Sequence, residues 1–347
     1  MARNIAGLDI GTTAVRAAEL SVRHGRVVLE RLGHAGLPPG AVVDGEVVDP
    51  TAVAAAIKTL WRRARFHAKQ VILGVANQRV VVRLVDLPWM EPQELRSSIT
   101  YQAQEFLPIP VAETELDYAV LGEQDAAQGH RMLRVLLVAA QKEMLAGHLG
   151  AVAMARLDPV GIDLNPIALL RSLTPIAGFS DGAEALVDVG ARVTNVVIHE
   201  DGAPRFVRIL LMGGENVTAT LQRALDLDHE EAERVKLAVS VDDAPDPRAA
   251  NLIEQQLEAF TAEIRDSLDF YRGQQDAVPL GRVVVSGGGS LLGSLVERLQ
   301  AAAGVSVERG RSLAAVRVGR LGLAAEQLAE LEPMAAIPVG LALGAVA

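Results

Sequence analysis

The chain contains the same short pattern twice, about half its length apart, and this duplication constrains the fold more than any other feature. Asp9-Ile10-Gly11 ends one predicted strand and Asp188-Val189-Gly190 ends another. Each strand opens a predicted three-strand meander, at Ile5–Ile10, Val15–Val22 and Arg26–Leu32 and again at Ala185–Val189, Val193–His199 and Arg205–Leu211. A single Asp-x-Gly is common by chance, whereas two copies at the same place in the same meander indicate an internal duplication. The sequence therefore predicts two similar halves.

Helices and strands alternate through the rest of the chain, which is typical of an α/β protein. Hydrophobic spacing predicts helices at Thr51–Phe66, Gln93–Glu105, Lys142–Ala155, Glu215–Leu225, His229–Ser240, Leu252–Tyr271, Leu291–Ala303 and Ala324–Leu331, and an Ala/Leu-rich helix at the end. Short apolar runs predict further strands at Val71–Val75, Val80–Val85, Leu133–Ala140, Val283–Val285 and Val305–Glu308. Loops are predicted at Gly122–Gly129 and Asp243–Arg248.

The composition excludes several classes of protein. The 347 residues include no cysteine, which excludes disulfide scaffolds, thiolate zinc sites and cysteine nucleophiles and fits a reducing cytoplasm. A net charge of −10 and an aromatic content of 3% argue against an extended phosphate-binding surface and against base stacking, so we expect no nucleic-acid partner. No run resembles a signal peptide or is apolar and long enough to span a bilayer. Any membrane association is therefore expected to be indirect.

Three glycine turns directly follow predicted strands, at Gly11-Thr12-Thr13, Gly190-Ala191-Arg192 and Gly287-Gly288-Gly289. Because glycine has no Cβ, backbone N–H groups in such turns can approach an anion closely. Taken singly, each turn is as well explained by ordinary hairpin geometry. The joint pattern favours a phosphate site, at which the two threonine hydroxyls reach the anion and Asp9 holds Mg²⁺ through its water shell.

Other nucleotide and catalytic motifs are missing from the sequence. No glycine precedes a lysine, so there is no Walker A loop, and Gly287–Gly293 does not satisfy G-x-G-x-x-G. The chain also has no G-x-S-x-G elbow and no H-E-x-x-H zinc motif. The duplicated glycine turns are thus the candidate nucleotide site.

The two Asp-Gly meanders, followed by the glycine-rich turn, resemble the phosphate and adenosine loops of the actin-like ATPases, a superfamily that includes actin, Hsp-type chaperones, sugar kinases and FtsA. Four stretches look more specifically like the PilM family of type IV pilus assembly proteins: Leu87–Leu95, Gln102–Pro110, Leu116–Tyr118 and Glu263–Tyr271. The resemblance covers essentially the whole chain. It implies a duplicated actin-like ATPase fold of class α/β, in which each half has a mixed sheet flanked by helices and the nucleotide lies in the cleft between the halves.

The resemblance also assigns roles to individual residues for binding ATP and Mg²⁺. Three sets match the first phosphate loop, the second phosphate loop and the adenosine loop: Asp9, Gly11, Thr12 and Thr13; Asp188, Gly190 and Thr194; Gly287, Gly288, Gly289 and Ser290. In this assignment Asp9 and Asp188 are the metal residues. Glu233 and Lys236 resemble a helix pair that reaches the adenosine, and at i and i+3 they share one helix face. The alternative for this pair is a surface ion pair worth roughly 0–1 kcal/mol.

One departure from the superfamily bears on catalysis. Many actin-like ATPases orient the attacking water with a Glu or Gln, whereas Ile162-Asp163-Leu164-Asn165-Pro166 places an Asn there. A neutral amide cannot act as a general base. If this segment is a strand, Asp163 lies on the same side as Asn165 and could substitute. We expect ATP binding with slow turnover at most.

The resemblance implies a partner and a location. PilM proteins are cytoplasmic, lack a membrane anchor and bind the short cytoplasmic N-terminus of the inner-membrane protein PilN as an extended peptide. They work with other pilus platform and motor proteins. The implied function is a cytoplasmic ATP-binding scaffold of the type IV pilus assembly platform, held at the inner face of the cytoplasmic membrane by its partner.

In that family an extra subdomain, here between about Leu87 and Gly150, forms the peptide groove together with the first subdomain. The expected boundaries are 1–86 and 151–182 for the first subdomain, 87–150 for the inserted one, 183–214 and 276–332 for the core of the second half, 215–275 for its helical subdomain and 333–347 for a terminal helix that packs on the first half.

Three alternatives share the fold. A small-molecule kinase would carry a dedicated substrate insertion, and we find none. A filament-forming protein like FtsA would end in a basic amphipathic helix, whereas Gly340–Ala347 carries no charge. This observation does not decide against the alternative of an MreB-like filament-forming protein. The cytoplasmic part of a type II secretion assembly protein would continue into a membrane helix. Binding of ATP and of a PilN-like peptide would separate these alternatives.

Overall fold

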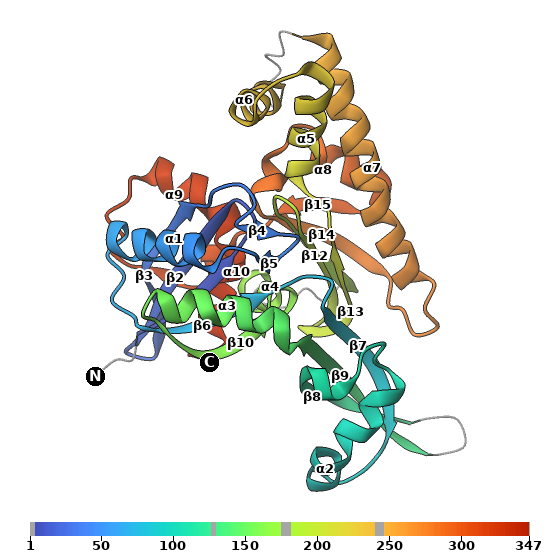
Figure 1. Ribbon diagram of the computed structural model, residues 1–347. Helices are drawn as coiled ribbons and strands as arrows, with labels where there is room; N and C mark the ends of the chain where they lie inside the picture. Colours follow the sequence, from blue (N-terminus) through green and yellow to red (C-terminus); the bar gives the residue numbers. More distant parts are fainter. Residues whose placement is uncertain (1–3, 126–129, 175–181, 240–245, 347) are drawn as a thin grey trace.

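Two sheets form the centres of the two halves in the computed structural model, which describes residues 4–125, 130–174, 182–239 and 246–346 (Figure 1). The first sheet has the order β10-β6-β1-β2-β3-β16 and the second the order β13-β12-β11-β14-β15. The strands of the first are β1 (Ile5–Ile10), β2 (Ala14–Arg23), β3 (Arg26–Gly36), β6 (Gln70–Val75), β10 (Asp158–Leu164) and β16 (Arg317–Val318). Those of the second are β11 (Ala183–Val189), β12 (Thr194–Glu200), β13 (Ala203–Leu210), β14 (Leu280–Ser286) and β15 (Ser306–Arg309). The predicted α/β class is confirmed.

The two sheets repeat one topology. β1 pairs antiparallel with β2 and parallel with β6, and β11 pairs antiparallel with β12 and parallel with β14. The register is repeated as well, because Arg16 lies opposite Asp9 and Asn195 lies opposite Asp188. Each aspartate therefore occupies the same place near the C-terminal end of a central strand.

Two helices, α4 (Asn165–Leu173) and α10 (Ala336–Leu343), fill the space between the sheets. Their apolar residues share one buried cluster with Leu186, Val197 and Val284 of the second sheet. α10 packs so closely on β1 that a Cβ added at Gly7 would lie 2.0 Å from the carbonyl oxygen of Pro338. The side chains of Asp9 and Asp188 emerge on these facing sides of the sheets, because they share the period-2 parity of Gly7 and Leu186.

The outer faces of both sheets are covered by further helices. α1 (Pro50–Arg63) and α3 (Lys142–Met154) pack on the first sheet, and α1 begins after Asp49, which caps the amides of Thr51 and Ala52. The second half carries α5 (Gly214–Leu225), α6 (His229–Val239), α7 (Pro247–Arg272) and α8 (Leu295–Ala303). A short hairpin, β4 (Val42–Val43) and β5 (Glu46–Val47), follows β3, and α9 (Ala325–Leu331) precedes α10. Among the described ranges, no helix combines the length and apolar character needed to cross a membrane.

The inserted segment forms a small sheet of its own, with the order β7-β9-β8. Its strands are β7 (Val80–Pro88), β8 (Thr114–Asp125) and β9 (Arg131–Gln141), and α2 (Pro92–Gln102) covers one face over an apolar core. Figure 1 shows it projecting from the body beside β13. Both β7 and β8 are edge strands of this sheet.

Four sequence predictions were wrong in detail. The loop expected at Asp243–Arg248 ends earlier, because α7 begins at Pro247 after its cap Asp246, while 243–245 lie outside the described residues. Residues 122–125 belong to β8 rather than to the expected loop, while 126–129 lie outside the described residues. The helix expected from Leu291 begins at Leu295, because a 3-10 turn at Gly288–Leu291 and the left-handed Ser294 come first. Asn165 is the first residue of α4, since Pro166 favours the first helical turn, so the strand ends before it.

Candidate functional site

Asp9 and Asp188 line the same small cavity between the two halves. Both are buried, with 4% and 6% of their surface exposed. Gly11, Thr12 and Gly190 of the two predicted phosphate loops also line it, as do Arg16, Asn165 and Asn195. Because α4 begins at Asn165, its positively polarised N-terminus lies beside the cavity.

The two carboxylates have different partners. Asp9 accepts hydrogen bonds from Nη1 of Arg16 at 3.2 Å and from Nδ2 of Asn165 at 3.3 Å. Asp188 accepts one from Oγ of Ser286 at 2.9 Å. Burial raises the pKa of Asp188 to about 6; the hydrogen bond from Ser286 opposes this rise and the charge of Asp9 adds to it. The cavity is thus lined by two acidic side chains, Asp9 and Asp188, and by the guanidinium of Arg16.

Within the described part of the chain, three buried polar atoms on this cavity have no hydrogen-bond partner: Oδ1 of Asn165, Oδ1 of Asn195 and Nε of Arg16. Buried polar groups nearly always have partners, so these atoms indicate a place for a polar ligand or ordered water. Carboxylate and amide oxygens are the ligands that Mg²⁺ prefers, directly or through its waters. An arginine N–H suits a phosphate oxygen. The donor set therefore fits Mg²⁺ and phosphate.

A second cavity, of about 360 Å³, continues from the first and shares Arg16, Gly190 and Ala191 with it. Thr13, Gly288 and Gly289 line it, as do the apolar side chains of Leu237, Leu291 and Met334. Residues of the first and third glycine turns therefore border one continuous space.

Glu233 and Lys236 stand on the wall of this second cavity. Nζ of Lys236 donates to Oε1 of Glu233 at 2.5 Å and to Oγ1 of Thr218 at 2.9 Å. Only 9% of the Lys236 side chain is exposed, so the alternative of a surface ion pair does not describe it. Nζ of Lys236 also donates to the carbonyl oxygen of Gly214 at 3.4 Å, so a polar ligand bound by this ammonium would take the place of one of these partners.

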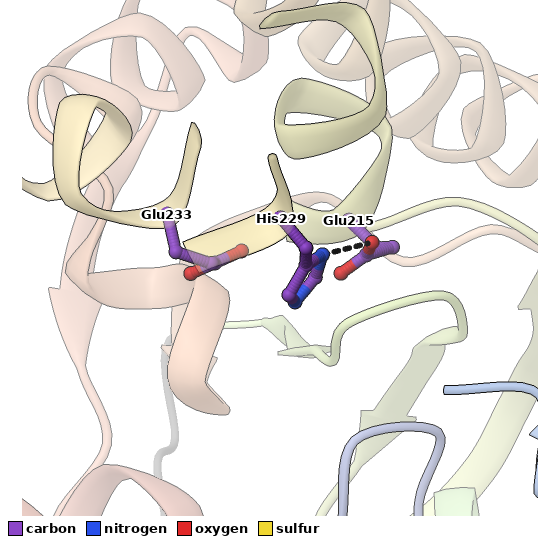
Figure 2. Close-up of side chains that lie close together, drawn as sticks. All are labelled: Glu215, His229 and Glu233. Carbon is purple, nitrogen blue, oxygen red and sulfur yellow. Dashed lines mark ion pairs between the residues drawn. The ribbon is translucent and has the colours of Figure 1, made fainter. Parts of the chain in front are cut away.

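Figure 2 shows Glu215, His229 and Glu233 close together at this cavity. Nδ1 of His229 lies 3.5 Å from Oε1 of Glu215, and one ligand atom from each residue lies within 4.8 Å of the others. Burial raises the pKa of Glu215, which nearby His229 opposes. Lys236 already supplies a positive charge to Glu233, so the three side chains form a polar wall without needing a metal ion.

Four predicted site residues do not line either cavity. The hydroxyl of Thr194 donates to the carbonyl of Met212 at 2.8 Å, and that of Ser290 donates to the carbonyl of Gly287 at 2.7 Å. Gly287 has a positive φ of 83° and lies directly under Val189, where a Cβ would clash, so it supports the turn. Asp163 forms an ion pair with Arg171 instead of facing Asn165.

Sequence reasoning missed Arg16, Asn195 and Ser286. The signal was present for the first two, because each stands opposite its aspartate in the repeated hairpin. Ser286 lies beside Asp188 through the parallel pairing of β11 and β14, which joins residues far apart in the chain.

The comparisons identify the family. The family of the type IV pilus assembly protein PilM matches residues 7–346. The chain belongs to this family. One chain of a solved PilM-PilN type IV pilus biogenesis complex aligns with a TM-score of 0.88 and 32% identity, over 99% of this chain and 98% of that one. The fold is therefore the actin-like ATPase fold of PilM, as predicted.

The chain is also similar to more distant proteins. The cell division protein FtsA of Streptococcus pneumoniae serotype 2 is 25% identical over 341 residues, which cover 87% of this chain and 74% of FtsA. A solved structure of MreB 5 of Spiroplasma citri, bound to AMPPNP, aligns over 90% of this chain and 93% of its own with a TM-score of 0.49 and 14% identity.

A third cavity, of about 860 Å³, separates the inserted sheet from the first half, where the PilM resemblance places a peptide groove. We call it the β8–β10 groove. β8 and β9 form one wall, and α3, β10 and the start of α4 form the other. Its lining is largely apolar and includes Leu116, Leu136, Leu145 and Ile162. β8 and β10 are both edge strands, so unpaired backbone groups border the groove.

Proposed function

We propose that this chain is a cytoplasmic ATP-binding scaffold of a type IV pilus assembly platform, and that it binds the cytoplasmic N-terminal peptide of a PilN-like inner-membrane protein. Membership of the PilM family supports the assignment to pilus assembly. The 32% identity to a chain of a PilM-PilN complex, over nearly the full length of both, supports the partner. In this proposal the partner holds the chain at the inner face of the cytoplasmic membrane.

One observation carries the nucleotide part: two buried aspartates border a cavity with unpartnered amide oxygens, and that cavity continues into one lined by Glu233 and Lys236. Asp9 and Asp188 would hold hydrated Mg²⁺, which neutralises and orients phosphate groups when bound. The Gly11 and Gly190 turns and the nearby hydroxyls of Thr12 and Thr13 would receive the phosphates.

Arg16 pairs with Asp9 at 3.2 Å. Because Mg²⁺ would neutralise Asp9, the guanidinium would then be available to a phosphate oxygen.

We infer that the output is assembly and not chemistry. The residue that the fold brings to the phosphate end is Asn165, whose amide cannot take a proton from water. Asp163, the proposed substitute, pairs with Arg171 and lines the β8–β10 groove. The arrangement therefore favours nucleotide binding with slow turnover at most.

The β8–β10 groove supports the peptide part. An extended peptide can pair its backbone with an exposed strand edge while alternate side chains enter pockets. The groove offers two such edges and an apolar floor. Charged groups of both signs stand on its walls, including Lys142 and Asp117, so the terminal charge and polar side chains of a peptide can be matched there.

Calorimetry tests both the nucleotide part and the peptide part of the proposal. The ligands are Mg²⁺-ATP and a peptide with the N-terminal sequence of the PilN-like protein encoded in the same gene neighbourhood. Ala146 is exposed on α3 and lines the groove, so Ala146→Arg should block the peptide while ATP binding stays intact. Ala153 is exposed on the same helix outside the groove lining, which makes Ala153→Arg a matched control. The groove would be rejected as the peptide site if both variants lost peptide binding equally, or if neither variant lost it.

A further inference from the structure

One face of the inserted sheet is shared between the β8–β10 groove and the second half. Successive residues of a strand alternate between faces. On β9, Leu133, Val135, Leu137 and Ala139 belong to the core under α2, whereas Leu136, Val138 and Ala140 line the groove. Arg134 has the same parity as the groove residues.

The edge of this same sheet that lies farther from the groove contacts the second half. β7 lies against β13, and Val82 of β7 and Ile209 of β13 join one apolar cluster with Leu145 and Leu164 of the first half. The three parts of the molecule therefore meet at this cluster. Beyond it, β7 and β13 border a cavity of about 530 Å³, and Asp86, Arg134 and Asp276 also line it.

Arg134 forms ion pairs both within the inserted sheet and with the second half. Its guanidinium pairs with Asp86, its cross-strand neighbour on β7, at 3.1 Å. It also pairs with Asp276, in the segment between α7 and β14 of the second half. Only 19% of the Arg134 side chain is exposed. The hydrogen bond from Arg134 lowers the pKa of Asp276, as expected for a charge-assisted contact.

A second ion pair links the halves beside the nucleotide cleft. Arg192 of the second glycine turn lies 3.3 Å from Asp44, in the turn between β4 and β5. A ligand between the halves that changes their relative orientation acts on both ion pairs, because the second half is built around one packed core.

We propose that the Arg134–Asp276 ion pair couples the nucleotide cleft to the β8–β10 groove by fixing the inserted sheet to the second half. The proposal rests on the proposed function for its two ligands. When the halves change orientation around ATP, Asp276 moves with the second half and carries Arg134 with it. Arg134 lies on β9, and the following β9 residues on the same face form a wall of the β8–β10 groove. The width of the groove therefore depends on whether ATP is bound between the halves.

The predicted measurement is the ratio of peptide affinities with and without saturating Mg²⁺-ATP. Coupling free energies between sites typically correspond to factors of roughly 5 to 150, and the same factor must appear in the ATP affinity with and without peptide. Asp276→Asn removes the inter-half charge and, because its side chain is 56% exposed, leaves the fold intact. In this variant the ratio should fall to about one, while each ligand alone still binds.

Asp86→Asn is the matched control, since it removes the partner within the inserted sheet and leaves the inter-half pair. Its ratio should stay near that of the wild type. Amide hydrogen exchange of β13 in the ligand-free chain gives an independent readout, because Asp276→Asn should speed exchange there and Asp86→Asn should not.

The outcomes separate two kinds of failure. A wild-type chain that binds both ligands with a ratio of one overturns the coupling alone, as does an Asp276→Asn variant that keeps the wild-type ratio and the wild-type exchange of β13. A wild-type chain that binds neither ligand overturns the proposed function, and the coupling with it. Loss of the ratio in Asp276→Asn with retention in Asp86→Asn supports the coupling.

Discussion

Replacing Asp188 with Asn should stabilise the ligand-free chain while removing one of the two residues proposed to hold Mg²⁺. The Asp188 carboxylate is buried, and its main partner is the hydroxyl of Ser286 at 2.9 Å. Asn keeps the size of the side chain and an oxygen to accept that hydrogen bond, but carries no charge. The charge on Asp188 therefore costs stability in the absence of a cation, because burial and the neighbouring Asp9 both oppose ionisation.

The size and sign follow from the pKa. Burial raises the pKa of Asp188 from 3.8 to about 6, and each pKa unit corresponds to about 1.4 kcal/mol, so ionisation costs the folded chain about 3 kcal/mol. Between these two pKa values the folded chain binds more protons than the unfolded chain. The free energy of unfolding therefore falls as the pH rises from about 4 to 6, and the full cost applies above that window.

Urea unfolding of the wild type and Asp188→Asn at pH 4, 6 and 8 tests this reasoning. The variant should gain about 3 kcal/mol at pH 8 and almost nothing at pH 4. Asp163→Asn is the control, because Asp163 has an arginine partner and its loss should not stabilise. A variant less stable than the wild type at pH 8, or a gain independent of pH, would refute the argument. Mg²⁺-ATP should stabilise the wild type and not Asp188→Asn.

Three further results are expected. Asp9→Ala should abolish the Mg²⁺-dependent part of ATP binding in calorimetry with an unchanged circular dichroism spectrum; an unchanged affinity in the folded variant would remove Asp9 from the site. Lys236→Met should weaken ATP by about 1.5–3 kcal/mol, the worth of a charged hydrogen bond, while inorganic triphosphate binding stays the same. Asn165→Glu should raise the slow rate at which phosphate is released from ATP. A wild-type rate near the enzyme median of about 10 per second would show that another residue activates water.

The fold and the placement of Asp9 and Asp188 on one cavity were predictable from the sequence because their signals are local. Each Asp-Gly pair follows a strand in the same short meander, and the repeat defines the sheet, the turn and the facing aspartates together. The inserted subdomain was expected only from the stretches that resemble PilM, because no hydrophobic periodicity indicates it.

Other features depend on contacts between distant parts of the chain, which local patterns do not encode. Thr194 and Ser290 follow the expected motif, yet each hydroxyl is used by a backbone carbonyl of its own half. Asp163 could be placed only by knowing where the strand ends, because the start of α4 at Asn165 turns the two side chains apart. The pairing of Arg134 with Asp276 joins two subdomains and leaves no pattern in either segment.

The close contact between α10 and β1 determines when this protein can finish folding during its synthesis. β1 leaves the ribosome long before α10, because most of the described elements lie between them in the chain. Gly7 meets the backbone of Pro338 and Ala342 with no space for a Cβ, so one face of the central strand stays uncovered until α10 emerges. Domains usually fold as they are made, N-terminal first. Here the N-terminal half must wait for the other half, and its exposed apolar face would make nascent chains candidates for chaperone binding.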